Sequence, residues 1–196
     1  MLADCMMFAA VAAGPVLKFY DTFTGVNGTL LTAHTPDVNT FPGGWVALNG
    51  TNTNSIINLN ISKMSGYVST GIDTGSTTTT YTISGLVTSG SSLGSGCIAR
   101  AAVGLPTDTL PAGWIFGSKD YGETLAILES TSAQIIARAT AVLSGAKNIT
   151  VTWAGDTATL GASGVTLSYS CPTKGRYWGV SSVGGVNYVD IFKLEA

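Results

Sequence analysis

A two-residue alternation of apolar and hydroxyl side chains late in the chain limits the possible folds more than any other pattern. Residues 149–153 alternate Ile, Val and Trp with two Thr. A period of two places the apolar side chains on one face of a strand and the hydroxyls on the other. A turn at residues 154–156 leads to a return strand at 158–160, and residues 165–169 alternate again. The pattern predicts a meander of short, half-buried strands.

Comparable segments recur about every ten residues, separated by turn signals. Thr, Ser and Gly (27, 19 and 25 residues) make up more than a third of the 196 residues, whereas the helix formers Glu, Lys and Arg are scarce. Residues 124–142 are rich in Ala, so a helix competes there with the hairpin that we expect. The other expected strands are 17–23, 45–48, 56–61, 78–86, 98–103, 114–117, 177–181 and 186–194. We therefore expect an all-β chain, a two-sheet antiparallel sandwich of the jelly-roll kind spanning residues 17–196 as one domain.

Charged residues are only 10% of the chain, against roughly 25% in an average soluble domain. Solubility then depends on hydroxyls, amides and the backbone, which suits a protein packed against neighbours. The formal net charge is -2, and the nine basic residues are scattered. Because no basic cluster exists, nucleic-acid binding is not expected.

The first sixteen residues form an apolar segment that we treat as an N-terminal arm. No basic residue precedes Lys18, and the apolar run 5–17 is shorter than the ~20 residues of a membrane helix. We expect neither a signal peptide nor a membrane span. The arm docks either on its own sandwich or on a partner subunit, and the contact candidates are Met6, Met7, Phe8 and Val11.

Three cysteines, Cys5, Cys97 and Cys171, leave at least one thiol unpaired. An odd count argues against a disulfide framework. We expect buried free thiols. A bridge between Cys97 and Cys171 is the alternative.

Both ends of the chain carry a family resemblance. Near the start, residues 19–23 read Phe-Tyr-Asp-Thr-Phe, followed by 27–31, 34–37 and Trp45; near the end, residues 177–180 read Tyr-Trp-Gly-Val and 188–192 read Tyr-Val-Asp-Ile-Phe. These segments resemble the opening and closing strands of concanavalin A-like or laminin G-like jelly rolls found in bacteriophage virion proteins. The resemblance implies the fold more firmly than the function. It also implies that the first and last strands are neighbours.

Two aspartates stand on these end strands among apolar residues. By period two, Asp21 shares a face with Leu17, Phe19 and Phe23, and Asp190 shares one with Val186, Tyr188, Phe192 and Leu194. Either each carboxylate caps backbone amides of a nearby loop, since a buried charge must be hydrogen-bonded, or one or both help to hold a calcium ion, as in some laminin G-like relatives. No other cofactor is expected.

Catalysis has no recognisable constellation. Glycoside hydrolases of such jelly rolls need two carboxylates about 5 to 9.5 Å apart. Glu123 and Glu129, six residues apart, would lie ~20 Å apart on an extended strand. The single histidine, His34, stands in a turn-rich connection, where a hydrogen bond to the local turn is the expected role. No Gly-rich phosphate-binding motif occurs. We expect no enzymatic activity.

Aromatic side chains are the candidates for a binding surface. Trp114 lies in a stretch flanked by Pro and Gly, near Asp120 and Tyr121. These three residues are candidates for a surface that contacts a glycan or a partner. For Trp114, the alternative is a plug at the end of the sandwich.

The leading functional hypothesis is a virion structural protein of the capsid decoration, head-fibre or tail accessory type. It would bind the major capsid or tail protein of a virus particle through the arm and a sheet edge or face, as a homo-oligomer such as a trimer. The alternative is a carbohydrate-binding module or phage adhesin that recognises a cell-surface glycan.

Overall fold

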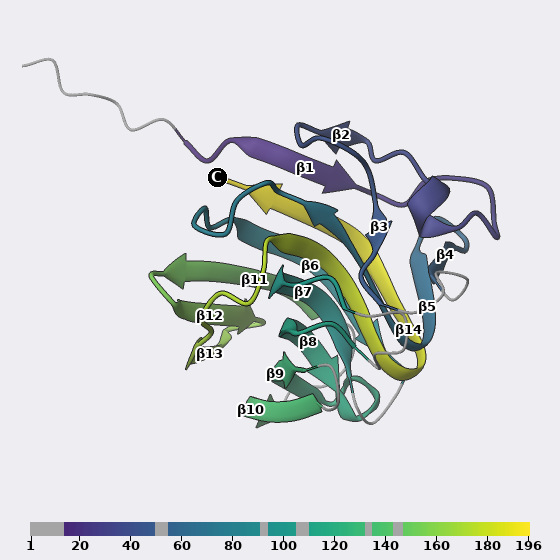
Figure 1. Cartoon of the computed structure of the whole chain (residues 1–196). Helices are drawn as coiled ribbons and strands as arrows, with labels where there is room; N and C mark the ends of the chain where they lie inside the picture. The colour runs from purple at the N-terminus through teal and green to yellow at the C-terminus, as the bar shows by residue number, and fades with distance from the viewer. Residues whose placement is uncertain (1–13, 50–54, 91–93, 105–109, 132–134, 143–146) are drawn as a thin grey trace, which may run out of the picture.

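The computed structural model describes residues 14–49, 55–90, 94–104, 110–131, 135–142 and 147–196. In this part of the chain the fold is an antiparallel β-sandwich, as expected, with two short 3-10 turns (Figure 1). The elements are β1 (Leu17–Asp21), η1 (Leu31–Ala33), β2 (Val38–Asn39), β3 (Val46–Ala47), β4 (Ser55–Ile57), β5 (Ser62–Asp73), β6 (Thr82–Ser89), β7 (Ser95–Ala101), β8 (Gly113–Lys119), η3 (Asp120–Gly122), β9 (Thr124–Ser130), β10 (Ile135–Val142), β11 (Lys147–Ala154), β12 (Thr157–Ala162), β13 (Val165–Ser170) and β14 (Tyr177–Glu195).

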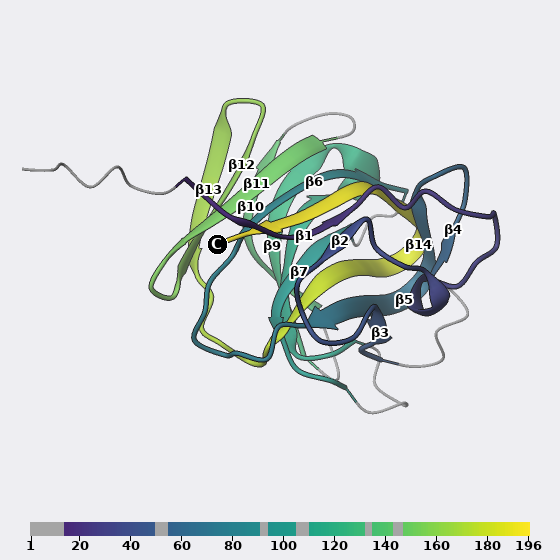
Figure 2. The ribbon, with the colours of Figure 1, turned by 90° about the horizontal axis from the view of Figure 1, so that it is seen from above.

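The two layers of the sandwich share β14. Its first part pairs with β7, which continues through β8 and β9 to β10; its last part pairs with β6, which continues through β11 and β12 to β13. On its other side β14 pairs with β5 and then with β1. Figures 1 and 2 show β14 bending back at one side of the molecule, so that its first half lies in one layer and its last half in the other. The sheets are therefore continuous through one bent strand, where the sequence pattern predicts two separate strands.

Glycines make this bend. Gly184 and Gly185 have φ of 70° and 65°, and Gly66 has φ of 78°. The register of β14 against β5 shifts at the same place, between Val183 and Val186. Because a residue without a Cβ adopts positive φ at little cost, these glycines allow both strands to turn the corner together.

Asn187 fixes the corner from inside. Its Nδ2 donates to Ser182 Oγ at 2.5 Å and to the Gly184 carbonyl at 2.7 Å. Its Oδ1 accepts from Ser89 Oγ at 3.1 Å and from the Gly90 amide at 2.9 Å. All four hydrogen-bonding positions of the amide are used, which is what a fully buried Asn requires.

The main core lies between the layers. Ile149 and Val151 are buried, while Thr150 and Thr152 are exposed, so the predicted alternation of β11 is confirmed. Strands β7 and β8 are buried almost throughout, because a second apolar cluster covers their other face. The members of that cluster are Leu48, Ile98, Ala101, Leu110, Ile115, Ala126, Leu128 and Val183.

The chain ends of the described fold lie side by side, as the resemblance implied. β1 pairs with β14 from Leu17 opposite Glu195 to Asp21 opposite Phe192. Val16 and Ala196 exchange two backbone hydrogen bonds. The predicted arm contacts Met6, Met7, Phe8 and Val11 fall in residues 1–13, outside the described residues. In the part of the chain that is described, no helix has the length and apolarity needed to cross a membrane.

Cys97 and Cys171 are buried free thiols, so the alternative of a bridge between them is wrong. Burial raises the pKa of both thiols, that of Cys171 to about 12. Neither thiol is ionised or reactive at neutral pH. Cys5 lies outside the described residues.

Candidate functional site

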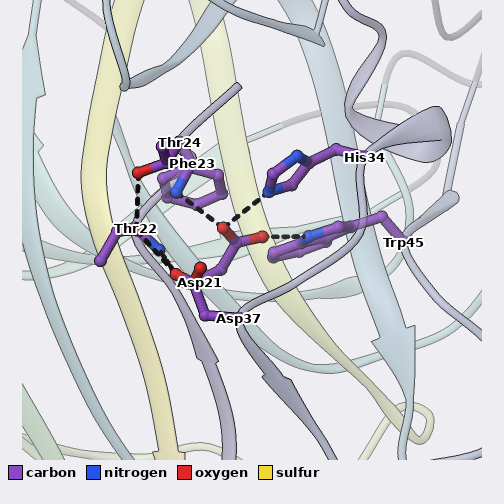
Figure 3. A network of polar contacts seen from close by, with 7 residues as sticks. All are labelled: Asp21, Thr22, Phe23, Thr24, His34, Asp37 and Trp45. Carbon is purple, nitrogen blue, oxygen red and sulfur yellow. Dashed lines mark hydrogen bonds and ion pairs between the residues drawn. The ribbon is translucent and has the colours of Figure 1, made fainter. Parts of the chain in front are cut away.

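A buried aspartate organises the segment between β1 and β3. Asp21 has no exposed surface, and its carboxylate accepts three hydrogen bonds (Figure 3). The Phe23 amide donates to Oδ1 at 2.6 Å, His34 Nε2 lies 2.9 Å from the same oxygen, and Trp45 Nε1 donates to Oδ2 at 2.7 Å. The carboxylate thus connects three separate points of the chain.

This network serves the fold. Burial raises the pKa of Asp21, and the hydrogen bonds from Trp45, His34 and Phe23 oppose that rise. Next to it, the backbone and hydroxyl of Thr22 both donate to Asp37 Oδ2, at 2.8 and 2.7 Å, which lowers the pKa of Asp37. The loop-capping alternative for Asp21 is confirmed. His34 contacts β1 rather than its own turn, which corrects the local role expected for it.

Asp190 lies at a β-bulge. Against β6, Val189 pairs with Val87 and Ile191 with Leu86, so Asp190 is the extra residue between them. On the other side of β14, the pairing with β5 stops at Val189 and the pairing with β1 starts at Phe192. The bulge therefore falls where β14 changes neighbours, and bulges commonly redirect a side chain in this way.

The bulge breaks the period of two. Val189 and Phe192, three residues apart, are both buried, whereas Tyr188 and Asp190 are only partly buried. Asp190 therefore shares a face with Tyr188 but not with Phe192 and Leu194. The alternation alone predicts that all four residues lie on one face. The carboxylate faces the outside of the sandwich instead of the core.

A small surface pocket opens at this point. It has a volume of about 170 Å³ and is lined by Ile61, Leu86, Thr88, Tyr188 and Asp190. This is smaller than the roughly 300–1,000 Å³ of pockets for drug-sized ligands. The pocket therefore suits one small ring or the end of a longer molecule.

The pocket combines an aromatic ring, aliphatic carbons and a few polar groups. Tyr188 lies between two cross-strand neighbours, Lys63 on β5 and Thr88 on β6; directly opposite residues on such pairs are about 4.5–5.5 Å apart. Among the described residues, no hydrogen bond or ion pair engages the Asp190 carboxylate, which remains able to accept hydrogen bonds from a ligand.

The two aspartates do not converge on one ion. Asp21 points into the core and its carboxylate already accepts three hydrogen bonds, while Asp190 lines the outer pocket. Within the described ranges no group of three or more His, Cys, Asp or Glu side chains could hold a metal. The joint calcium site inferred from their positions on the end strands therefore has no geometric basis.

The structure separates the three residues predicted to form a binding surface. Trp114 is only 3% exposed; its indole donates to the Pro172 carbonyl at 2.9 Å, and the Lys174 ammonium lies over its ring. Tyr121 is 71% exposed and, with Asp120, follows the other end of β8, ~20 Å away along the strand. Trp114 is thus a buried plug, as the second of the two alternatives for this residue predicted. It does not form one site with Asp120 and Tyr121.

The carboxylates give no hydrolase pair in the pocket. Glu129 pairs with Lys174 at 2.5 Å, Glu195 pairs with Lys193 at 2.7 Å, and Asp190 is the single carboxylate among the residues that line the pocket. The arrangement can bind and orient a polar ring, but it does not present the acid and base that glycoside hydrolysis needs.

Sequence reasoning singles out Asp190 and misses its neighbours. The alternation places Tyr188 on the same strand face, but nothing in the sequence connects it with Ile61 or with Leu86 and Thr88. Their proximity depends on the pairing of β14 with β5 and β6. The signal that could have found the site is the polar residue between two apolar ones at Val189-Asp190-Ile191, which is where the bulge occurs.

Comparison with known proteins finds a solved structure with a similar fold. No family model matches the chain, and no curated protein matches it. Among solved structures, the chain is similar to carbohydrate binding module CBM66 from Bacillus subtilis, with a TM-score of 0.58 and 11% sequence identity, over 78% of this chain and 95% of that one. The likeness confirms the jelly-roll β-sandwich implied by the resemblance of the chain ends, and it lends no support to the link with bacteriophage proteins.

Proposed function

We propose that this protein binds carbohydrate without transforming it, and that the pocket around Tyr188 and Asp190 holds a sugar ring. The observation that carries the proposal is the partly buried carboxylate of Asp190, which has no partner among the described residues and lies beside an aromatic ring. The similar fold of a carbohydrate binding module supports it. The proposal takes up the alternative that the sequence left open.

The chemistry of the pocket matches the two faces of a sugar. The C–H groups of a pyranose or furanose ring pack against an aromatic face and aliphatic carbons, which Tyr188, Ile61 and Leu86 supply. Its hydroxyls donate to a carboxylate and exchange hydrogen bonds with a threonine, and Asp190 and Thr88 supply these groups. Only one ring fits in about 170 Å³, so the pocket would take a chain end or a single unit.

A glycan array followed by calorimetry tests the proposal. Asp190→Asn should weaken binding of the best glycan by about tenfold to a hundredfold, because a hydrogen bond to a charged group contributes about 1.5–3 kcal/mol. Tyr188→Ala should weaken it by about tenfold, because the sugar loses the aromatic face against which it packs. Tyr121→Ala is the matched control, since Tyr121 is an exposed tyrosine that is not among the residues lining the pocket. The proposal fails if no glycan binds, or if Tyr121→Ala weakens binding and Tyr188→Ala does not.

The virion hypothesis rests on the sequence alone, through the low charge, the apolar arm, the lack of a recognisable catalytic constellation and the resemblance of the chain ends. We propose that the same sandwich is located on a virus particle and that its partners are proteins of that particle. A glycan-binding surface there would act in adhesion. Deleting residues 1–14 should abolish copurification with intact particles while leaving the sandwich folded. Unchanged copurification of the truncated protein would contradict this assignment.

A further inference from the structure

The outer face of β6, β11, β12 and β13 carries an ordered array of hydroxyl groups. Registered pairing places these side chains in rows across the strands. One row is Ser84, Thr150, Gly161 and Thr166; a second is Thr152, Thr159 and Ser168; and a third contains Thr157 and Ser170. Adjacent strands are about 4.8 Å apart, and rows on the same face repeat about every 6.8 Å along a strand. The result is a regular hydroxyl lattice rather than scattered threonines.

The lattice is uncharged. Strands β6, β12 and β13 contain no Asp, Glu, Lys or Arg, and the single charged residue of β11, Lys147, is buried and donates to the Gly122 carbonyl. At the β14 border of the face, Lys193 and Glu195 neutralise each other in an ion pair. A charged polymer gains nothing from such a surface, whereas hydroxyls that can both donate and accept suit a neutral ligand with the same groups.

Gly161 leaves a gap, the Gly161 notch, in the first row of hydroxyl side chains, and the fold does not require a glycine at this position. A Cβ at this position would meet Thr166 Cγ2 at 3.8 Å and the Thr150 carbonyl at 3.9 Å, which are ordinary contacts. Its φ lies outside the left-handed region. Glycine in the middle of a strand weakens it, so this position trades sheet stability for open space between Thr150 and Thr166. This differs from Gly96, Gly117 and Gly179, where a Cβ would come within 2.1 Å of a carbonyl oxygen.

The lattice adjoins the pocket. Leu86 and Thr88 of β6 line the pocket, and the cross-strand partner of Leu86 on β11 is Asn148, which begins the exposed polar face. A chain whose end occupies the pocket would pass over Asn148 and then across the rows. The strand spacing is comparable to the length of one sugar unit, so successive units would meet successive strands.

We propose that this hydroxyl face is an extended binding platform for a neutral polysaccharide chain, whose terminal ring lies in the pocket and whose following units cross β11 and β12 over the Gly161 notch. The inference rests on the proposed carbohydrate binding and adds the substrate class, a neutral polymer rather than a short or charged sugar. The lack of charge, the notch and the continuity with the pocket favour this occupant.

The experiment compares a polymer with its own short oligosaccharide. Neutral β-glucan, xylan, mannan, fructan and dextran are screened beside an acidic polysaccharide, polygalacturonate, and calorimetry then compares the best neutral polymer with its disaccharide. The full-length protein should bind the polymer at least about tenfold more tightly per site, which corresponds to one or two additional hydrogen bonds. Gly161→Thr should remove most of this advantage. It should leave disaccharide binding unchanged, and the melting temperature should stay the same or rise.

Two further variants sharpen the result. Gly44→Thr is the matched control, because Gly44 is exposed, has no positive φ and would bring an added Cβ within 4 Å of no other atom; it should bind the polymer as the wild type does. The double variant Thr150→Val, Thr166→Val removes the hydroxyls beside the notch and keeps the β-branched shape, and should also lose the polymer advantage.

The outcomes separate the two proposals. If the wild type binds the disaccharide and polymer equally, or if Gly161→Thr and the double variant bind the polymer like Gly44→Thr, the platform is overturned while carbohydrate binding stands. If no saccharide binds, the proposed function itself fails. Preference for an acidic polysaccharide over all neutral ones would also overturn the platform.

Discussion

The indole of Trp45 donates a hydrogen bond of 2.7 Å to the buried carboxylate of Asp21, 24 residues earlier in the chain. Trp45 also packs edge-on against Phe19, with the ring centroids 5.2 Å apart. The contact therefore ties the loop between β1 and β3 to the core through both a polar and an aromatic interaction. Its energetic role can be measured directly.

We expect Trp45→Phe to destabilise the protein by about 1–3 kcal/mol, because a buried carboxylate loses one of its three donors. In a background that already carries Asp21→Asn, the same substitution should cost less. Urea unfolding of the four proteins in a double-mutant cycle gives the coupling energy. A coupling near zero would show that the hydrogen bond contributes nothing beyond packing.

The pH dependence of stability should report on Asp21. Burial raises the pKa of this carboxyl above its ordinary value of 3.8, so the folded state holds the proton more tightly than the unfolded chain. The stability contributed by this group is fully present below pH 3.8 and is lost as pH rises through the folded-state pKa. The unfolding free energy of the wild type relative to Asp21→Asn should therefore fall across this window and then level off.

Asp37 provides the opposite control. Hydrogen bonds from Thr22 lower its pKa, so its contribution is present above pH 3.8 and is lost as pH falls through the folded-state pKa. Relative to Asp37→Asn, the wild type should gain stability with rising pH. Chemical unfolding of the three proteins over this range checks both signs, and parallel curves would contradict the assignment of Asp21.

The corner of β14 should be sensitive to a single methyl group. Gly184→Ala places a Cβ on a residue with φ of 70°, which costs about 1–2 kcal/mol. Gly44→Ala, at an exposed glycine without positive φ, should have little effect. Urea denaturation measures both, and equal stabilities would show that the bend tolerates another backbone conformation.

The two buried thiols should resist alkylation until the protein unfolds. Cys97 and Cys171 are buried and their pKa values are raised, so neither supplies thiolate at neutral pH. Iodoacetamide labelling followed by peptide mass spectrometry should modify both only in denaturant. Rapid labelling of either cysteine in the native protein would contradict the described burial.

Where local pattern and burial agree, the sequence predicts the elements well. The β11–β13 meander has the expected alternation, and the Ala-rich stretch 124–142 forms the β9–β10 pair rather than a helix. Strand β5 is not predicted at all. Its buried positions include Ser69, Thr70 and Gly71, and small polar residues give no apolar period even though Ser69 is paired with Ser181 in the interior.

The candidate site is only partly predictable. Asp190 stands out as a carboxylate on an apolar strand, but the alternation assigns it to the core face, because a period-two argument assumes an unbroken ladder. One extra residue at the bulge reverses that assignment. Trp114 stands out as a candidate surface residue, yet its neighbours Pro172 and Lys174 come from a distant segment that covers it.

Local sequence information was enough to establish an antiparallel β-sandwich, since alternation, Thr and Ser content and turn residues act over a few neighbouring positions and need no distant contact. Which polar residues are buried and which face outward follows instead from tertiary contacts. That choice depends on strand pairing between residues as far apart as Lys63 and Tyr188, and on where glycines and a bulge bend β14. For the same reason the pocket and the hydroxyl lattice became visible only once β6, β11, β12, β13 and β14 were placed side by side.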